Sequence, residues 1–265
     1  MRTVLVRRAV LTASAVSLTL LATACGSGKA GGAEADFKNA ARASATRPSA
    51  APSSGAAAGP KGKTAGELRP LLVTEADLPE HRLERVEDSA AQDDPIETDK
   101  APCKPLAQAE GMQPIGVSAG VARVVASGRP RAATEGAGAE GKADAVADAV
   151  RTTATSVALV SYDGKGAEEA IGAVKAGVEA CAGGFSVTQT GERTAIESVK
   201  ADTALPGGDE AVSFVTVMDL GDGDRNVTRV VVLRKGNTLA TFTALSLTGE
   251  AEQPKAVVDA QAKKL

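Results

Sequence analysis

The stretch that decides the fold is Thr228–Lys235, with the sequence TRVVVLRK, followed by Gly236-Asn237 and by Thr238–Leu247, with the sequence TLATFTALSL. Both runs are rich in β-branched and other apolar residues, which favour strands. A two-residue connection made of glycine and asparagine is typical of a tight hairpin turn. We therefore predict two antiparallel strands joined at Gly236-Asn237.

Further strands are predicted on the N-terminal side of this hairpin. The candidates are Val117–Ala126, Thr153–Tyr162, Phe185–Thr190, Thr194–Val199 and Ala211–Met218. Thr153–Tyr162 has apolar residues on both faces, which indicates a central strand. Consecutive strands with tight turns favour an antiparallel sheet. The sequence predicts an α+β fold with an antiparallel sheet of about five to six strands and helices packed on one face.

Three helices are expected to cover that face. The clearest is Ala167–Ala182, where apolar residues recur every three or four positions and Gly183-Gly184 follows as a terminator. A shorter helix opens at Pro102-Cys103 and runs to about Glu110. Gln253–Leu265 is predicted to form a closing helix with a proline in its first turn.

Cys103 and Cys181 form one even pair among the three cysteines, because Cys25 belongs to the N-terminal region described next. Such a pair in an oxidising compartment favours a disulfide, with free thiols as the alternative. A metal site would need further ligands, and the chain has one histidine and no CxxC motif. Cys181 also lies on the apolar stripe of its predicted helix, which supports a fixed partner. We expect a Cys103–Cys181 disulfide.

Residues 1–24 have the pattern of a secretory signal peptide. Three arginines precede an uncharged run from Ala9 to Ala24, which is shorter than the roughly 20 residues of a membrane-spanning helix. The end of the run, Leu21-Ala22-Thr23-Ala24-Cys25, resembles the bacterial lipobox, whose cysteine is lipidated and becomes the new N-terminus. An ordinary signal peptide is the alternative. We predict a lipoprotein, acylated at Cys25 with chains such as palmitate, on the outer face of the cell membrane.

The rest of the chain divides into a tether and a domain. Residues 25–65 are dominated by Ala, Gly, Ser, Pro and Lys without hydrophobic periodicity, so we predict a lipid-anchored, disordered tether. Residues 66–265 suit one α+β domain. Without residues 1–24, which hold three of the 30 basic and none of the 33 acidic residues, the net charge is −6. This acidity, and a content of one Tyr, four Phe and no Trp, argue against nucleic acid as a partner.

No pattern predicts a catalytic, cofactor-binding or metal-binding residue. Asp222-Gly223-Asp224 resembles the start of a calcium loop, but the glycine and glutamate required further on are missing, which favours a solvated hairpin turn. Gly164-Lys165-Gly166 precedes a helix without a complete phosphate-binding motif. His81 stands in a charged segment without a nucleophile motif, so we expect a solvated loop histidine.

Several short motifs together resemble a group of actinobacterial lipoproteins that are similar to the extracellular sensor domain of mycobacterial membrane serine/threonine kinases. The motifs are Leu71-Leu72, Asp77-Leu78-Pro79, Cys103-x-x-Leu106, Ser161-Tyr162, the helix ending in Cys181, Gly208-Asp209-Glu210-Ala211 and Gly236-Asn237-Thr238-Leu239. The resemblance implies an antiparallel sheet flanked by helices, with a cleft for an unknown ligand and no catalytic residues. Those kinase domains carry two disulfides, whereas this chain can form one.

The leading functional hypothesis is a non-enzymatic, surface-tethered binding or sensing module. Its partners would be the membrane, through the lipid anchor, and an unknown small ligand or envelope protein. A lipid or lipoglycan carrier is the first alternative, and it requires an apolar cavity. A cell-wall hydrolase is the second, and carboxylates converging in a cleft would favour it.

Overall fold

The computed structural model describes residues 59–86, 94–129, 152–221, 223–246 and 250–265. The predicted signal peptide, Cys25 and most of the predicted tether lie outside these ranges. The described residues all belong to one unit of the chain, Ser54–Leu265. None of the helices within them is long and apolar enough to span a membrane.

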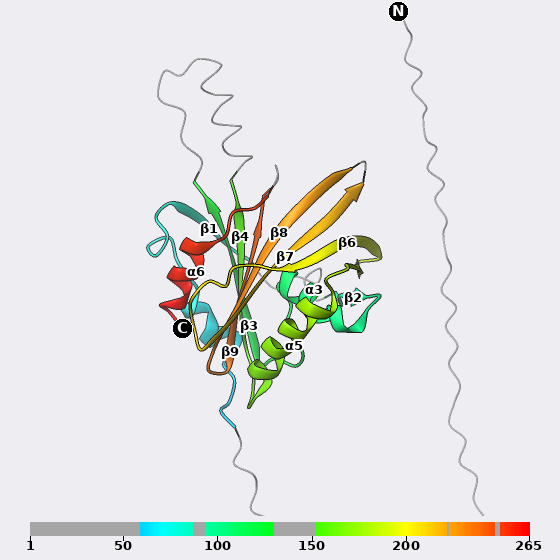
Figure 1. Ribbon diagram of the computed structural model, residues 1–265. Coiled ribbons are helices and arrows are strands. Elements are labelled where there is room, and N and C mark those ends of the chain that lie inside the picture. Colours follow the sequence, from blue (N-terminus) through cyan, green and yellow to red (C-terminus); the bar gives the residue numbers. More distant parts are fainter. Residues whose placement is uncertain (1–58, 87–93, 130–151, 222, 247–249) are drawn as a thin grey trace, which may run out of the picture. The chain divides into compact units, whose positions relative to one another are not determined.

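The described residues form a single antiparallel sheet whose strand order is β1-β3-β4-β9-β8-β7-β6-β5-β2 (Figure 1). The sequence prediction of five to six strands was therefore too low, since the sheet has nine. The strands are β1 (His81–Arg85), β2 (Glu97–Thr98), β3 (Gly120–Gly128), β4 (Ala154–Ser161), β5 (Phe185–Gln189), β6 (Glu192–Ala201), β7 (Glu210–Gly221), β8 (Asp224–Lys235) and β9 (Thr238–Leu245).

The predicted hairpin lies in the middle of the sheet. Lys235 of β8 pairs with Thr238 of β9, and the turn between them begins at Gly236, whose φ of 56° is in the left-handed region. β9 also pairs with β4 along its whole length, and seven of the eight β9 residues are buried. The prediction that Thr153–Tyr162 contains a central strand is confirmed.

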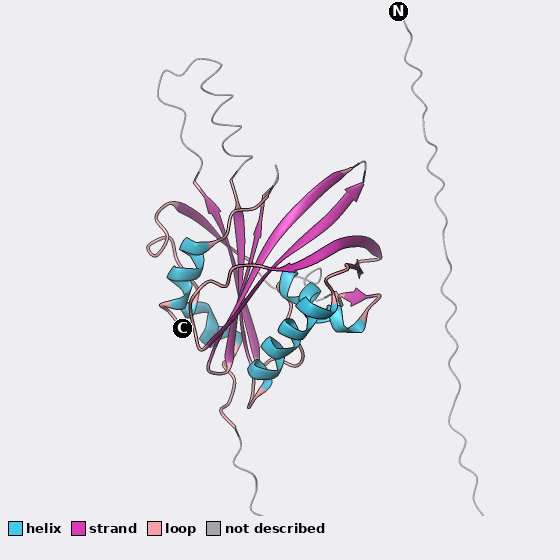
Figure 2. Cartoon of the chain, viewed as in Figure 1, coloured by secondary structure: helices cyan, strands magenta, loops and turns pink. Residues whose placement is uncertain are grey.

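Helices cover both faces of the sheet, so the prediction of helices on one face was wrong (Figure 2). Val230 and Val232 of β8 contact one hydrophobic cluster, and Val231 and Leu233 contact the other. Successive side chains of a strand point to opposite faces, so this apolar run needs a cover on each side. The first cover consists of α3 (Lys104–Glu110) and α5 (Gly166–Ala180), and the second of α1 (Ala65–Leu68) and α6 (Lys255–Ala262).

A disulfide fastens the first helical cover. Cys103 is bonded to Cys181, and their Cα atoms are 5.8 Å apart. The bond joins the short 3₁₀ helix η2 (Ala101–Cys103), which leads into α3, to the C-terminal end of α5. Gly177 allows the two helices to approach closely, because a Cβ there would lie 3.0 Å from the Leu106 side chain. The disulfide thus holds α3 over the sheet.

The segment 59–64 lies against the domain although the sequence analysis placed it in the tether. The Gly62 N–H donates to Asp163 Oδ1 over 2.7 Å, and Asn237 Nδ2 donates to the Lys61 carbonyl over 2.9 Å. The Gly164 N–H donates to the Pro60 carbonyl, so the glycine-containing turn before α5 holds the entering chain. The other predicted boundaries stay predictions.

Candidate functional site

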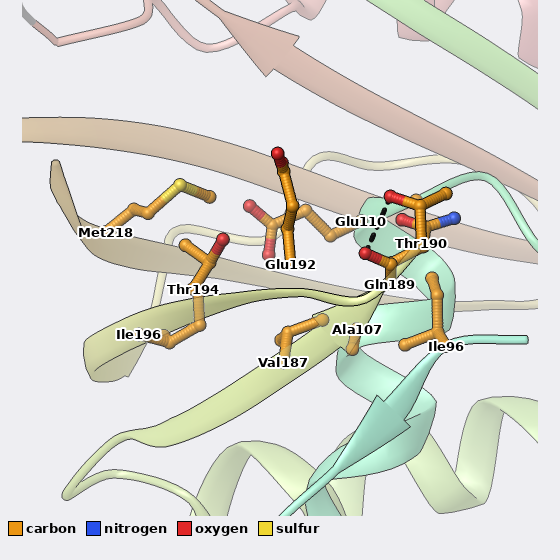
Figure 3. A pocket seen from close by; sticks show the side chains of 11 residues that line it. Ile96, Ala107, Glu110, Val187, Gln189, Thr190, Glu192, Thr194, Ile196 and Met218 are labelled. Atoms are coloured by element: carbon orange, nitrogen blue, oxygen red, sulfur yellow. Dashed lines mark hydrogen bonds between the residues drawn. The ribbon is translucent and has the colours of Figure 1, made fainter. Parts of the chain in front are cut away.

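A pocket of about 250 Å³ opens beside the C-terminal end of α3. Its wall combines α3, the segment before β2, the β5–β6 hairpin and one residue of β7 (Figure 3). The residues that line it are Ile96, Ala107, Glu110, Gly111, Val187, Gln189, Thr190, Glu192, Thr194, Ile196 and Met218. These residues lie far apart in the sequence, and the fold brings them together.

The apolar part of the wall follows from strand alternation. Val187 of β5 pairs with Thr194 of β6, and Phe185 pairs with Ile196 two residues further on. Alternate residues of a strand share one face, so Val187, Thr194 and Ile196 all point into the pocket. Ile96 and Met218 complete the apolar surface from either side. A hydrocarbon group entering the pocket would be removed from water.

Glu110 is the charged group set deepest among these apolar residues. It is the last residue of α3, where the backbone carbonyls concentrate partial negative charge and disfavour a carboxylate. Figure 3 shows its side chain extending across the pocket. Burial raises the pKa of the Glu110 carboxyl group, and hydrogen bonds with the Thr216 and Thr228 side chains oppose this shift only in part. No basic side chain is among the groups that shift the pKa of Glu110.

Hydrogen bonds from the sheet hold Glu110 and the residues that follow it. Thr216 Oγ1 donates to Glu110 Oε1 over 3.0 Å, and Thr243 Oγ1 donates to the Glu110 carbonyl over 3.1 Å. Arg123 of β3 donates from Nε to the Met112 carbonyl over 3.0 Å. The end of α3 is therefore held by β7, β9 and β3 together.

The mouth of the pocket is polar. Glu192 is exposed and stands at the start of β6, opposite Gln189 in the hairpin. The turn between them uses Thr190 and Gly191, with φ values of 52° and 81°. None of the described residues lining the pocket is Lys, Arg or His. The site offers an apolar interior, one half-buried carboxyl group and one exposed carboxylate.

Two solved structures are similar to this chain. The extracellular domain of PknH from Mycobacterium tuberculosis matches with 10% identity and a TM-score of 0.47, covering 77% of this chain and 97% of that one. A putative uncharacterized protein from Mycobacterium smegmatis matches with 14% identity and a TM-score of 0.35, covering 70% and 87%. No protein-family model and no curated protein matches the sequence. The extracellular domain of a mycobacterial kinase, to which the sequence motifs pointed, is thus found again among the similar solved structures.

His81 differs from its prediction as a solvated loop residue. It begins β1, pairs with Gly128 and is half-buried. Its Nδ1 atom is buried without a hydrogen-bond partner in the described parts of the chain, and burial lowers the pKa of the imidazole. The prediction failed because the strand HRLER is charged, as expected of an edge strand, and therefore resembles a loop in sequence. His81 does not line the pocket.

The other sequence candidates contribute no chemistry to the pocket. Asp222 and Cys25 lie outside the described residues, and Gly221 pairs with Asp224 at the β7–β8 turn, as a solvated hairpin requires. The described ranges contain no cluster of three or more His, Cys, Asp or Glu side chains suited to a metal ion. The sequence predicts a helix that ends at about Glu110, and no pattern predicts a role for that residue. An acid at a helix C-terminus, where it opposes the helix dipole, was the signal available.

Proposed function

We propose that this protein is a non-enzymatic binding or sensing module, tethered to the outer face of the cell membrane through Cys25, and that the Glu110 pocket is its ligand site. The observation that carries the proposal is a half-buried carboxyl group set among apolar side chains, without a basic partner in the pocket wall. A buried polar group without full compensation costs folding free energy, so it points to a functional use.

The size and lining of the pocket support a small ligand. Ligand pockets are concave and mostly apolar, with few polar groups that fix orientation, and typically measure about 300–1,000 Å³. The Glu110 pocket, at about 250 Å³, lies just below this range. It suits a small molecule or one group of a larger envelope component. The carrier alternative receives less support, because the interior of this pocket contains a carboxyl group.

A hydrolase is the second candidate, because Glu110 and Glu192 both line one pocket. Hydrolysis of glycosidic bonds uses two carboxyl groups, one of which has a raised pKa and acts as the acid. Glu110 has the raised pKa that the acid requires. However, its carboxyl group already accepts a hydrogen bond from Thr216, and the lining contains no aromatic ring on which a sugar could stack. We therefore place binding first.

The ligand site can be tested by filling the pocket. Thr194→Trp introduces a large side chain into the pocket from the half-exposed rim. The matched control is Ala195→Trp, which adds the same side chain to the neighbouring, exposed position on the other face of the hairpin. A small-molecule library is screened by ligand-observed NMR against residues 25–265 carrying Cys25→Ser.

We expect the molecules that bind the wild-type sequence to lose about tenfold or more in affinity with Thr194→Trp, which equals about 1.4 kcal/mol. Ala195→Trp should leave their affinity within about twofold. Equal binding by both variants would place the ligand elsewhere. Turnover of cell-wall fragments that disappears in both Glu110→Gln and Glu192→Gln would favour the hydrolase.

The anchor is tested separately. Cys25→Ala should remove acyl mass from the processed protein and shift it from the detergent phase to the aqueous phase, because two or more acyl chains are needed for stable anchoring. If wild type and variant partition alike and neither carries acyl mass, the anchoring proposal is wrong.

A further inference from the structure

We infer that the ligand of the Glu110 pocket is a small organic cation, an aliphatic ammonium ion whose charged group pairs with Glu110 while its hydrocarbon part contacts Ile196 and Met218. This inference rests on the proposed function, since it names the ligand class of the same pocket. It concerns the charge and shape of the ligand, which the two carboxyl groups and the apolar wall determine.

The charges around the pocket favour a cation. Glu110 and Glu192 are the charged residues among those that line it. An anionic ligand would meet two acids without a compensating base, whereas a cation within about 4–6 Å of Glu110 favours the carboxylate form.

Several charged groups on the surrounding elements have partners of their own. On β6, Arg193 pairs with Asp99, while Glu197 pairs with Arg225 of β8. On β3, Arg123 donates to the Met112 carbonyl at the end of α3. None of these groups lines the pocket, so Glu110 and Glu192 are the charged residues of the wall itself.

The hydrogen bonds of Glu110 indicate which groups a ligand would supply. Thr216 donates to Oε1. The Thr228 hydroxyl donates to Asn226 Oδ1 over 3.1 Å, and Asn226 is held in that orientation because its Nδ2 donates to the Ser246 carbonyl. The Thr228 hydroxyl therefore has two acceptors within reach, Asn226 and Glu110, for its single proton.

Burial favours a protonated Glu110 in the empty pocket. An ionised Glu110 would receive hydrogen bonds from the Thr216 hydroxyl and in part from the Thr228 hydroxyl, and its two oxygens can accept more. The N–H groups of an ammonium ion supply such donors together with the compensating charge. Binding would then convert Glu110 to its carboxylate and release one proton to solvent.

The proton balance sets the direction of the pH dependence. Burial raises the pKa of Glu110 in the empty protein, so at lower pH a bound cation must displace a proton. Affinity for the cation should therefore fall as the pH is lowered through that raised pKa. The affinity for an uncharged ligand should not fall over the same pH range.

Three probes of equal chain length test the inference: n-butylammonium chloride, n-butanol and sodium butyrate. The readout is the methyl NMR signal of Met218, which lines the pocket. The chain has three methionines, so removal of Met1 with residues 1–24 leaves Met112 as the other methyl signal and as an internal reference. The sample is residues 25–265 carrying Cys25→Ser.

We expect n-butylammonium to shift the Met218 signal and to bind at least about tenfold more tightly than n-butanol, with no shift from butyrate. Glu110→Gln, which keeps the shape of the side chain, should remove that tenfold preference for n-butylammonium over n-butanol. Calorimetry of the wild-type sequence in two buffers of different ionisation enthalpy should show proton release on binding of the ammonium ion. The calorimetric measurement uses the wild-type sequence, so it does not depend on whether Glu110→Gln folds.

Binding of n-butanol or butyrate as tightly as n-butylammonium would overturn the cation assignment. So would an absence of proton release below the raised pKa of Glu110. Either result leaves the proposed ligand site standing, provided that library ligands still lose affinity with Thr194→Trp. Conversely, library ligands unaffected by Thr194→Trp would remove the site, and the inference would fail with it.

Discussion

At the scale of single residues, Glu110 shows how tertiary contacts can hold a side chain whose position in its helix is unfavourable. A glutamate at a helix C-terminus opposes the helix dipole, and here it is also half-buried. Thr216 and Thr243 nevertheless hold its carboxyl group and its carbonyl. The residue therefore reduces stability in its ionised form while giving the pocket its polar group.

Comparing the unfolding free energy of Glu110→Gln with that of wild type at different pH values should reveal this cost. Because the pKa of Glu110 is raised above 4.5 by folding, its protonated form is favoured in the native state. The corresponding stability is fully present below the unfolded pKa and is lost as the pH rises through the folded pKa. In urea titrations across this range, the unfolding free energy of Glu110→Gln minus that of wild type should increase with pH, with a slope of at most about 1.4 kcal/mol per pH unit. A constant difference would mean that Glu110 titrates alike in both states.

At the scale of elements, α6 shows why the second face of the sheet is closed. Val257 and Val258 pack into the cluster that contains Val231 and Leu233 of β8. Gln261 of α6 is fully buried, and its amide joins this helix to the segment after α1. It accepts from the Val73 N–H over 3.0 Å and donates to the Leu71 carbonyl over 2.7 Å. One side chain thus satisfies two backbone groups from the other end of the domain.

Gln261→Leu should destabilise the domain by about 2–6 kcal/mol, since it leaves a backbone donor and a backbone acceptor without partners and each costs about 1–3 kcal/mol. The measurement is urea unfolding followed by circular dichroism. Gln253→Leu is the control, because Gln253 Nε2 donates to the Thr203 carbonyl at an exposed position where water can replace the bond. If both variants lose the same stability, the buried amide of Gln261 has no special role.

At the scale of the whole molecule, the Cys103–Cys181 disulfide links the α3 region to the end of α5 across 78 positions of sequence. The two hydrophobic clusters are built largely from Val, Leu, Ile and Ala, with few aromatic rings. A core of small side chains gains less from burial per residue, so a covalent link of this length contributes a large share of the total stability.

Replacing both cysteines by serine should lower the unfolding free energy by roughly 4.5 kcal/mol in the chain-entropy description of loop closure. Thermal unfolding with and without a reducing agent measures the effect. Reduction of the wild-type protein should reproduce the midpoint of the double variant, and reduction should leave the variant itself unchanged. An unchanged midpoint after complete reduction would contradict the structural role of the disulfide. Because the disulfide places α3, its loss should also weaken ligand binding in the Glu110 pocket.

The sequence by itself determined the elements that carry a strong local signal. The β8–β9 hairpin follows from two apolar runs around Gly236-Asn237, and α5 follows from its apolar stripe. The pairing of Cys103 with Cys181 follows from cysteine count and compartment. Each of these signals is contained in a short stretch or in a simple count, so it can be detected without knowing which segments meet.

Only the tertiary structure decided how many strands join the sheet, what covers each face, and where a ligand site forms. β1 and β2 are charged or very short, and long-range pairing with β3 and β5 makes them strands. The apolar run of β8 indicates that both faces are covered, but strand periodicity does not say by which helices. Glu110 accepts a hydrogen bond from Thr216, which lies 106 positions further along the chain, and its pKa is raised by burial against residues equally distant in sequence. A carboxyl group responds to the dielectric and hydrogen bonds around it, and these depend on contacts that no local pattern specifies.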